Sequence, residues 1–220
     1  MRFPIGQALV TAHQALARLA LHDAVLRCSY AGSVRRMEET VGDIDLVIAS
    51  ERPEEVVDAF FSLTQGTRQM KRSEEWRTKA ITVTHDGLRL ELSVVPPQFY
   101  GPTLVIYSGG RVHTCAMCKR ALQCMYGVYF GLLRYWWHSV PLMEVGGKIE
   151  ILMRLLRTSN AEESEQETGE EAIYKRLGVQ WIPPALRQGR EELETALAKS
   201  IIHTTHLENR SPFSPLFARW

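Results

Sequence analysis

Hydrophobic residues in the first half of the chain follow helical and extended periods in turn. Leucine and alanine recur at three- and four-residue steps through residues 5–25, which predicts an amphipathic helix. The apolar run at 26–31 predicts a short strand, and residues 43–49 alternate with the two-residue period of another strand. Pro53 fits the first turn of a helix that is expected to run to about Leu63.

The second half begins with a predicted hairpin and becomes mostly helical. Residues 79–84 and 88–95 read as strands joined by His85-Asp86-Gly87, because Asp-Gly between alternating segments is a hairpin signal. Helices are predicted over 98–107, 111–137, 170–177 and 189–202. The pattern therefore predicts a mixed α/β protein whose strands precede most of its helices.

Composition and charge narrow the class of protein. The chain has 220 residues, of which 45% are hydrophobic and 23% charged, and this excludes a disordered tail, a collagen-like repeat and a small disulfide scaffold. Its net charge of +1 means that nucleic-acid contact must come from a local patch. Four cysteines fit a reducing compartment, and the most apolar stretch, 123–140, is interrupted by Arg134 and His138. We expect a soluble cytoplasmic protein with no membrane contact.

Two aspartates are the first candidate for chemistry. Asp43 and Asp45 stand at i and i+2 of a predicted strand, so both carboxylates share one face, ~7 Å apart along the backbone. Such anions repel each other unless a cation lies between them. Mg²⁺ takes oxygen ligands and often shares its site with phosphates. The pair therefore predicts a magnesium site.

Two further features extend this site. Gly32-Ser33 opens a short helix upstream, where glycine lets backbone N–H groups approach an anion such as phosphate. Glu91 lies on the outward face of the second hairpin strand, so it can join the aspartates across neighbouring strands. Three carboxylates around two metal ions can activate a hydroxyl and stabilise a leaving pyrophosphate. Nucleotidyl transfer is the reaction that needs this set.

These motifs carry a resemblance to a known family. Gly-Ser at 32–33, Arg-Arg at 35–36 and Gly-Asp-Ile-Asp at 42–45 resemble the nucleotidyltransferase signature of family X DNA polymerases. Residues 90–97, 107–110 and 170–187 resemble further blocks of that family, in the same order. The resemblance implies an α/β (α+β) fold in which a palm with a mixed sheet flanked by helices carries a small, mostly helical thumb. Its expected boundaries are a palm at 1–110, a thumb-like domain at 111–202 and a tail at 203–220.

The resemblance also implies an activity. A family X member is a DNA-directed DNA polymerase, which adds deoxynucleotides to a primer 3′-hydroxyl and is expected to fill gaps during DNA repair. It implies two Mg²⁺ ions, with Mn²⁺ as a substitute, and a primer/template or gapped duplex and a dNTP as partners. Other repair proteins are further expected partners, and a bacterial member would be associated with the nucleoid.

Individual roles follow from the matching positions. Asp43 and Asp45 would bind both metals, and Glu91 would hold the metal near the primer 3′-hydroxyl. The resemblance assigns nucleotide binding to Gly32, Ser33, Arg36, Tyr107, Gly109 and Thr114, of which Tyr107 and Gly109 would line the sugar pocket. It assigns DNA binding to Thr78, Lys79, Arg89 and Arg111.

Three departures from the family keep other functions open. Glu91 stands where the family has Asp, and its extra methylene moves the carboxylate by ~1 Å, which can cost ~100-fold in rate. Thr114 replaces an Asn, and Tyr107-Ser108 replaces Phe-Thr. One alternative is a template-independent nucleotidyltransferase, because the palm motif alone does not exclude it. The other is a DNA-binding module that has lost catalysis.

Overall fold

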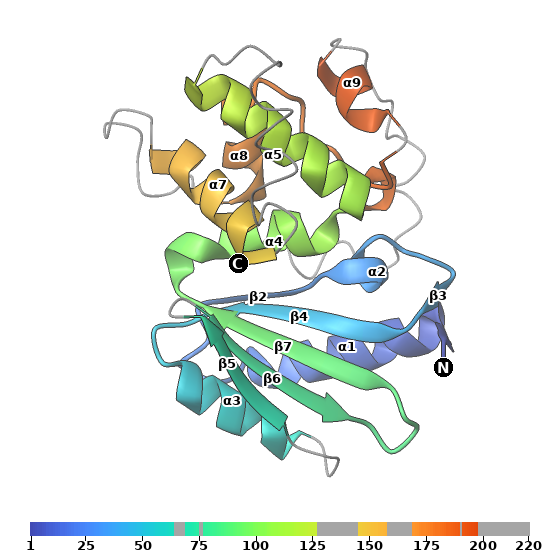
Figure 1. The fold of residues 1–220 in the computed structure, drawn as a ribbon. Coiled ribbons are helices and arrows are strands. Elements are labelled where there is room, and N and C mark those ends of the chain that lie inside the picture. Colours follow the sequence, from blue (N-terminus) through green and yellow to red (C-terminus); the bar gives the residue numbers. More distant parts are fainter. Residues whose placement is uncertain (64–68, 75–76, 127–144, 158–168, 190, 198–220) are drawn as a thin grey trace.

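A mixed five-stranded sheet forms one layer of the computed structural model, which describes residues 1–63, 69–74, 77–126, 145–157, 169–189 and 191–197 (Figure 1). In the order in which they pair, its strands are β2 (Arg27–Tyr30), β4 (Asp43–Ala49), β7 (Arg89–Val95), β6 (Arg77–Val83) and β5 (Gln69–Glu74). The β4–β7 pair is parallel and the other pairs are antiparallel. The predicted strands are confirmed. Strand β5 was not predicted, because its sequence QMKRSE has no apolar alternation.

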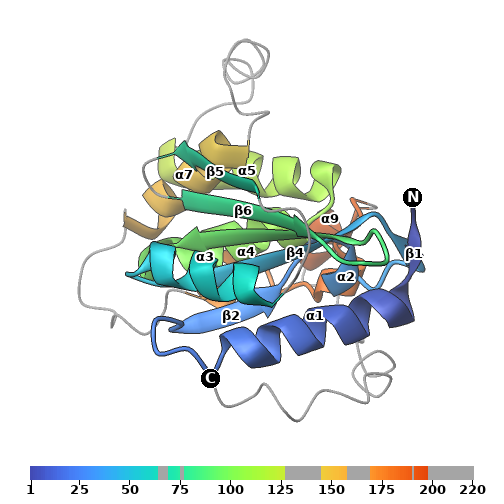
Figure 2. The same cartoon turned by 90° about the horizontal axis from the view of Figure 1, so that it is seen from below.

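Helices α1 (Ile5–Leu19) and α3 (Pro53–Ser62) cover one face of this sheet (Figures 1 and 2). They bury Leu16 and Phe60 against strand residues such as Ile44 and Leu90, and these side chains belong to one hydrophobic core. The prediction of α1 extended to residue 25, but the chain turns after Leu19 and leaves Leu21 exposed. Leucine periodicity alone does not detect that turn.

The opposite face of the sheet carries the other large helices (Figure 1). They are α4 (Tyr100–Ser108), α5 (Arg111–Tyr126), α7 (Val145–Arg157), α8 (Glu170–Arg176) and α9 (Glu192–Leu197). Helix α4 packs Tyr100 and Leu104 against the sheet, while its Val105 and Ile106 join a second core formed with α5, α7 and α8. One helix thus connects the strand layer to the helical part.

Short elements complete the described chain. They are the helix α2 (Gly32–Arg35), the 3-10 turns η1 (Pro97–Phe99) and η3 (Pro184–Leu186), and a two-stranded sheet of β1 (Phe3–Pro4) and β3 (Thr40–Val41). The predicted α/β class is therefore correct, and the arrangement is consistent with an α+β nucleotidyltransferase-like fold. The tail predicted at 203–220 lies outside the described residues. None of the helices described here is long and apolar enough to cross a membrane.

Candidate active site

The register of β4 and β7 brings the three acidic residues of the predicted site onto neighbouring strands. Asp45 lies opposite Glu91, and Asp43 lies opposite Arg89. Because side chains alternate along a strand, the three carboxylates share the face that looks toward α4. The intervening Ile44 is fully buried in the core on the other face. The alternation seen in the sequence therefore separates the acidic face from the core.

Asp45 shows that these carboxylates lie close enough to interact. Burial raises the pKa of Asp45, and the negative charges of Asp43 and Glu91 raise it further, to about 7. Lys79 and Arg36 act in the opposite direction. A carboxyl whose pKa is raised by neighbouring anions lies at a point where a cation is favourable.

Glu91 obtains positive charge from its own protein. Its Oε1 lies 2.5 Å from Arg89 Nη2, and its Oε2 forms an ion pair with Lys79 Nζ. The Glu91 side chain is only 11% exposed, whereas its partners Arg89 and Lys79 are 48% and 22% exposed. The geometry differs from the predicted convergence of three acids. Within the described ranges, no three His, Cys, Asp or Glu side chains are grouped to hold a metal ion.

The residues present nevertheless suit a divalent cation chemically. All three candidate ligands are carboxylates, and Mg²⁺ and Mn²⁺ prefer oxygen donors. Asp43 and Asp45 are half-buried on the same face, and among the described residues no side-chain hydrogen bond or ion pair occupies their carboxylate oxygens. Glu91 would have to exchange at least one of its two ion pairs to join them.

Gly32 lies directly against the carboxylate of Asp45. It has φ +60°, and a Cβ atom built on it would lie 2.0 Å from Asp45 Oδ2. Only glycine fits both the left-handed conformation and this approach. The backbone at the start of α2 therefore reaches the acidic face, as the sequence predicts for a phosphate-binding turn.

Arg36 links α2 to the turn that follows α4. Its Nη1 donates to the Ser108 carbonyl at 3.2 Å, and its Nε donates to Glu38 at 2.9 Å. The next residue of that turn, Gly109, packs so closely on α5 that an added Cβ would lie 2.7 Å from Thr114 Cγ2. These contacts connect Arg36 through Ser108 to Gly109, while Thr114 is buried behind Gly109.

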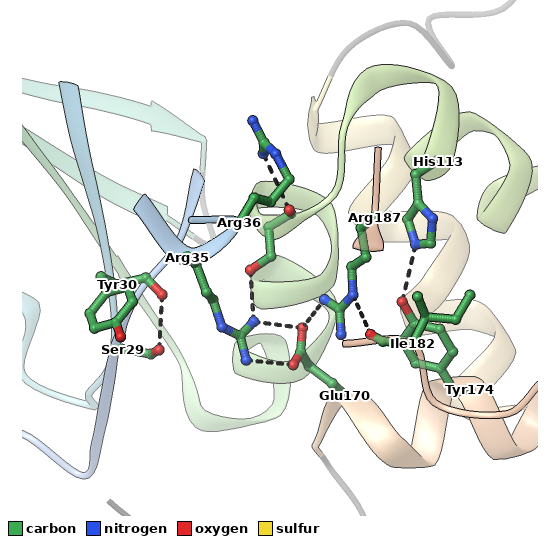
Figure 3. A network of polar contacts seen from close by, with 10 residues as sticks. Ser29, Tyr30, Arg35, Arg36, His113, Glu170, Tyr174, Ile182 and Arg187 are labelled. Carbon is green, nitrogen blue, oxygen red and sulfur yellow. Dashed lines mark hydrogen bonds and ion pairs between the residues drawn. The ribbon is translucent and has the colours of Figure 1, made fainter. Parts of the chain in front are cut away.

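A buried network holds the same α2 against the helical part (Figure 3). Arg35 donates two hydrogen bonds to the Glu170 carboxylate, at 2.8 and 2.7 Å, and a third to Ser108 Oγ at 2.7 Å. Arg187 donates to Glu170 at 2.6 Å from the other side. Burial alone would raise the pKa of Glu170, but the two arginines outweigh it and lower the pKa to about 2.

This network was not assigned from the sequence. Arg35 stands in a basic pair with Arg36, and Glu170 lies in a glutamate-rich stretch that is typical of a solvated loop, whereas the structure buries it. The two residues are separated by 135 positions, and no periodicity connects them.

Other predicted residues take different positions. Lys79 and Arg89 lie beside Glu91, and Arg111 is exposed at the start of α5. Thr78 is 7% exposed and lies opposite Val94 on the core face of the sheet, so the structure does not bring it to the acidic face. The hydroxyl of the buried Thr114 donates to the Arg111 carbonyl, at 3.1 Å.

A separate cavity of about 1150 Å³ lies between β2 and α8. Arg27, Tyr100, Glu170 and Trp181 are among its lining residues. None of the three acidic residues of the predicted site lines it. The cavity therefore lies beside the contact between Arg35 and Glu170 and is separate from the acidic face.

Comparison with known proteins gives one distant relative. The chain is 25% identical over 194 residues to a Bacillus subtilis protein described as DNA polymerase/3′-5′ exonuclease PolX. The match covers 88% of this chain but only 30% of the length of that relative. No family model matches the chain. The similarity runs through the strands that carry the acidic face and on into the helical part, and it points at most to a polymerase-like nucleotidyltransferase.

Proposed function

We propose that this protein is a family X-type DNA polymerase that adds deoxynucleotides to a primer 3′-hydroxyl on a template, and that it fills gaps in duplex DNA. The observation that carries the proposal is the parallel register of β4 and β7, which sets Asp45 opposite Glu91 on one face, directly below Gly32. The distant likeness to the Bacillus polymerase supports it. Residues 1–110 would act as the palm and 111–202 as the thumb.

The acidic face would perform the reaction. Asp43, Asp45 and Glu91 would hold divalent ions, which when bound supply positive charge at the primer hydroxyl and at the phosphates. Gly32 lets the backbone at the start of α2 approach the Asp45 carboxylate, and backbone N–H groups of this turn would face the phosphates. Ser33 and Arg36 would bind the triphosphate, and the positive charge of Arg36 would offset the negative charge that builds up there. Tyr107 and Gly109 would contact the sugar and Thr114 the base.

The basic residues beside Glu91 would contact the nucleic acid. Arg89 is 48% exposed and Lys79 is 22% exposed, so both can reach a phosphate while they neighbour the acidic face. Arg111 is exposed at the start of α5. Phosphate contacts of this kind predict DNA binding that weakens as salt rises. A DNA phosphate that pairs with Lys79 or Arg89 would also release Glu91 toward the aspartates.

The proposal is tested by extending a labelled primer in a gapped duplex with Mg²⁺ or Mn²⁺. The wild-type chain should extend the primer, and Asp45→Ala should lower the rate by about 100-fold or more. Asp58→Ala, which removes an exposed carboxylate from α3, is the matched control and should leave the rate unchanged. Absence of extension by the wild type, or full activity of Asp45→Ala, contradicts the proposal. Equal extension of a primer without template favours a template-independent enzyme.

The ion pairs of Glu91 favour one second candidate, a DNA-binding module that has lost catalysis. Lys79 and Arg89 already neutralise Glu91, so a catalytically silent site is consistent with the geometry. The substitution Glu91→Asp separates the two candidates. A polymerase adapted to Glu91 should slow about tenfold or more, because a shorter side chain misplaces the carboxylate by ~1 Å. A sharp rise in rate would show instead that the native chain is impaired.

A further inference from the structure

The hydroxyl of Tyr107 is held by two strands of the sheet. Arg77, at the start of β6, donates from Nη1 to the Tyr107 hydroxyl, and Ser93 of β7 donates to it at 3.4 Å. Tyr107 itself belongs to the last turn of α4. A phenylalanine at this position would pack its ring but would have no atom for either strand to hold.

The neighbours of Tyr107 and Ser93 connect this contact to α2 and to the acidic face. The residue after it, Ser108, accepts hydrogen bonds from Arg35 at its hydroxyl and from Arg36 at its carbonyl. On the opposite side, Ser93 pairs in register with Lys79, the partner of Glu91. Residues 107 and 108 therefore connect the sheet to Arg35 and Arg36: the Tyr107 side chain contacts β6 and β7, and Ser108 contacts the two arginines.

We propose that Arg77 is a specificity-determining positioning residue, which holds the Tyr107 ring at the sugar of the incoming nucleotide and so sets the preference for deoxyribose over ribose. This inference rests on the proposed function, because it places a nucleotide between α2 and the acidic face. It extends that function to a residue with no role in the resemblance, and it depends on the tyrosine that replaces the family's phenylalanine.

The physical reason lies in how a site rejects one additional hydroxyl. An apolar pocket alone discriminates weakly against a ligand that only adds a hydroxyl group. Discrimination rises when the wall that would clash is held rigidly. A hydrogen bond from a charged guanidinium is stronger than one between neutral groups, and it holds the ring through its far end. Without Arg77, rotation of the Tyr107 side chain would admit the 2′-hydroxyl.

The test measures nucleotide affinity apart from chemistry. Binding of dATP and of ATP is compared on a gapped duplex that has a dideoxy-terminated primer opposite thymine, for the wild type, Tyr107→Phe, Arg77→Leu and the double variant. Each single variant should lower the preference for dATP by about tenfold or more, the effect of one hydrogen bond to a charged group. The double variant should match Tyr107→Phe, because Tyr107→Phe already removes the contact with Arg77 together with the contact with Ser93.

Two further variants separate positioning from folding. Arg77→Lys keeps a charged donor and should recover part of the preference. Arg52→Leu removes an exposed arginine that pairs with Glu55 on α3, and it should behave as the wild type. Tyr107→Phe keeps the ring and its packing, so it remains informative if Arg77→Leu does not fold.

The outcomes also distinguish this inference from the proposed function. An unchanged preference in Tyr107→Phe, or effects that multiply in the double variant, overturns the role of Arg77 while primer extension can remain intact. If the wild type does not extend the primer but its preference for dATP over ATP still depends on Arg77, only the polymerase proposal is overturned. A wild-type chain that binds neither nucleotide overturns both.

Discussion

At the scale of single residues, Gly32 has the strictest requirement. Its φ of +60° and the 2.0 Å approach of a built Cβ to Asp45 Oδ2 leave no room for a side chain. Gly87 has a similar conformation, φ +83°, but nothing lies within 4 Å of its built Cβ. Substitution of Gly87 therefore carries only the cost of backbone strain, whereas substitution of Gly32 also carries the cost of a clash with Asp45.

We predict that Gly32→Ala lowers the free energy of unfolding by about 2 kcal/mol or more, because left-handed strain of about 1 kcal/mol adds to a clash with Asp45. Gly87→Ala should cost only the strain, about 1 kcal/mol. Urea unfolding of the two variants measures both values. Equal losses in the two variants would show that Asp45 moves aside freely.

The strand position of Glu91 determines the face on which its side chain lies, but not its ion-pair partners. Strand parity correctly predicted that it faces the same side as Asp43 and Asp45. Parity did not predict its ion pairs with Lys79 and Arg89, which depend on side-chain rotamers and on the neighbouring strand β6.

At the scale of elements, the contact between α2 and α8 is a polar link between the strand layer and the helical part. Glu170 of α8 accepts hydrogen bonds from Arg35 of α2 and from Arg187, and its side chain is 7% exposed. Removal of a charge from such a network leaves its buried partners uncompensated.

We predict that Glu170→Gln lowers the free energy of unfolding by about 3 kcal/mol, because two buried guanidinium groups then lack a carboxylate. The adjacent Glu171→Gln is the matched control, since Glu171 is exposed on the same helix turn, and it should stay within about 0.5 kcal/mol of the wild type. Urea unfolding measures both variants. A loss as small as that of the control would show that the network does not stabilise the fold.

At the scale of the whole molecule, two buried groups make stability depend on pH. His113 lies 2.8 Å from Glu192 and 3.1 Å from the Tyr174 hydroxyl, and burial lowers the pKa of His113 to about 4. The pKa of Glu170 is about 2. Both pKa values are lower in the folded chain than the usual values of about 6.5 and 4.3, so both groups stabilise the fold at neutral pH.

We predict that the contributions of His113 and Glu170 to stability are lost as pH drops, whereas Asp45, whose pKa is raised to about 7, acts in the opposite direction between about pH 7 and 4. The contribution of His113 is complete above about pH 6.5 and is lost as pH falls to about 4, and that of Glu170 is lost between about pH 4.5 and 2. Thermal unfolding of His113→Gln should show a smaller loss between pH 6.5 and 4.5 than the wild type. The exposed His85→Gln should follow the wild type. If the stability of His113→Gln depended on pH in the same way as that of the wild type, the role of His113 in this pH dependence would be contradicted.

Local periodicity by itself determined most strands, helices such as α1, α3 and α4, and the face on which Asp43, Asp45 and Glu91 lie, because these depend on the two- and 3.6-residue repeats of the backbone. It did not predict α7. Polar β5 was not predicted because it has no periodic apolar signal, and the end of α1 was misplaced because the apolar period continues past Leu19. Only the tertiary structure decided that Arg35 meets Glu170, that Arg77 holds Tyr107 and that Lys79 neutralises Glu91. These contacts join residues on different elements, and their partners are selected by how the sheet and helices pack, which no local repeat encodes.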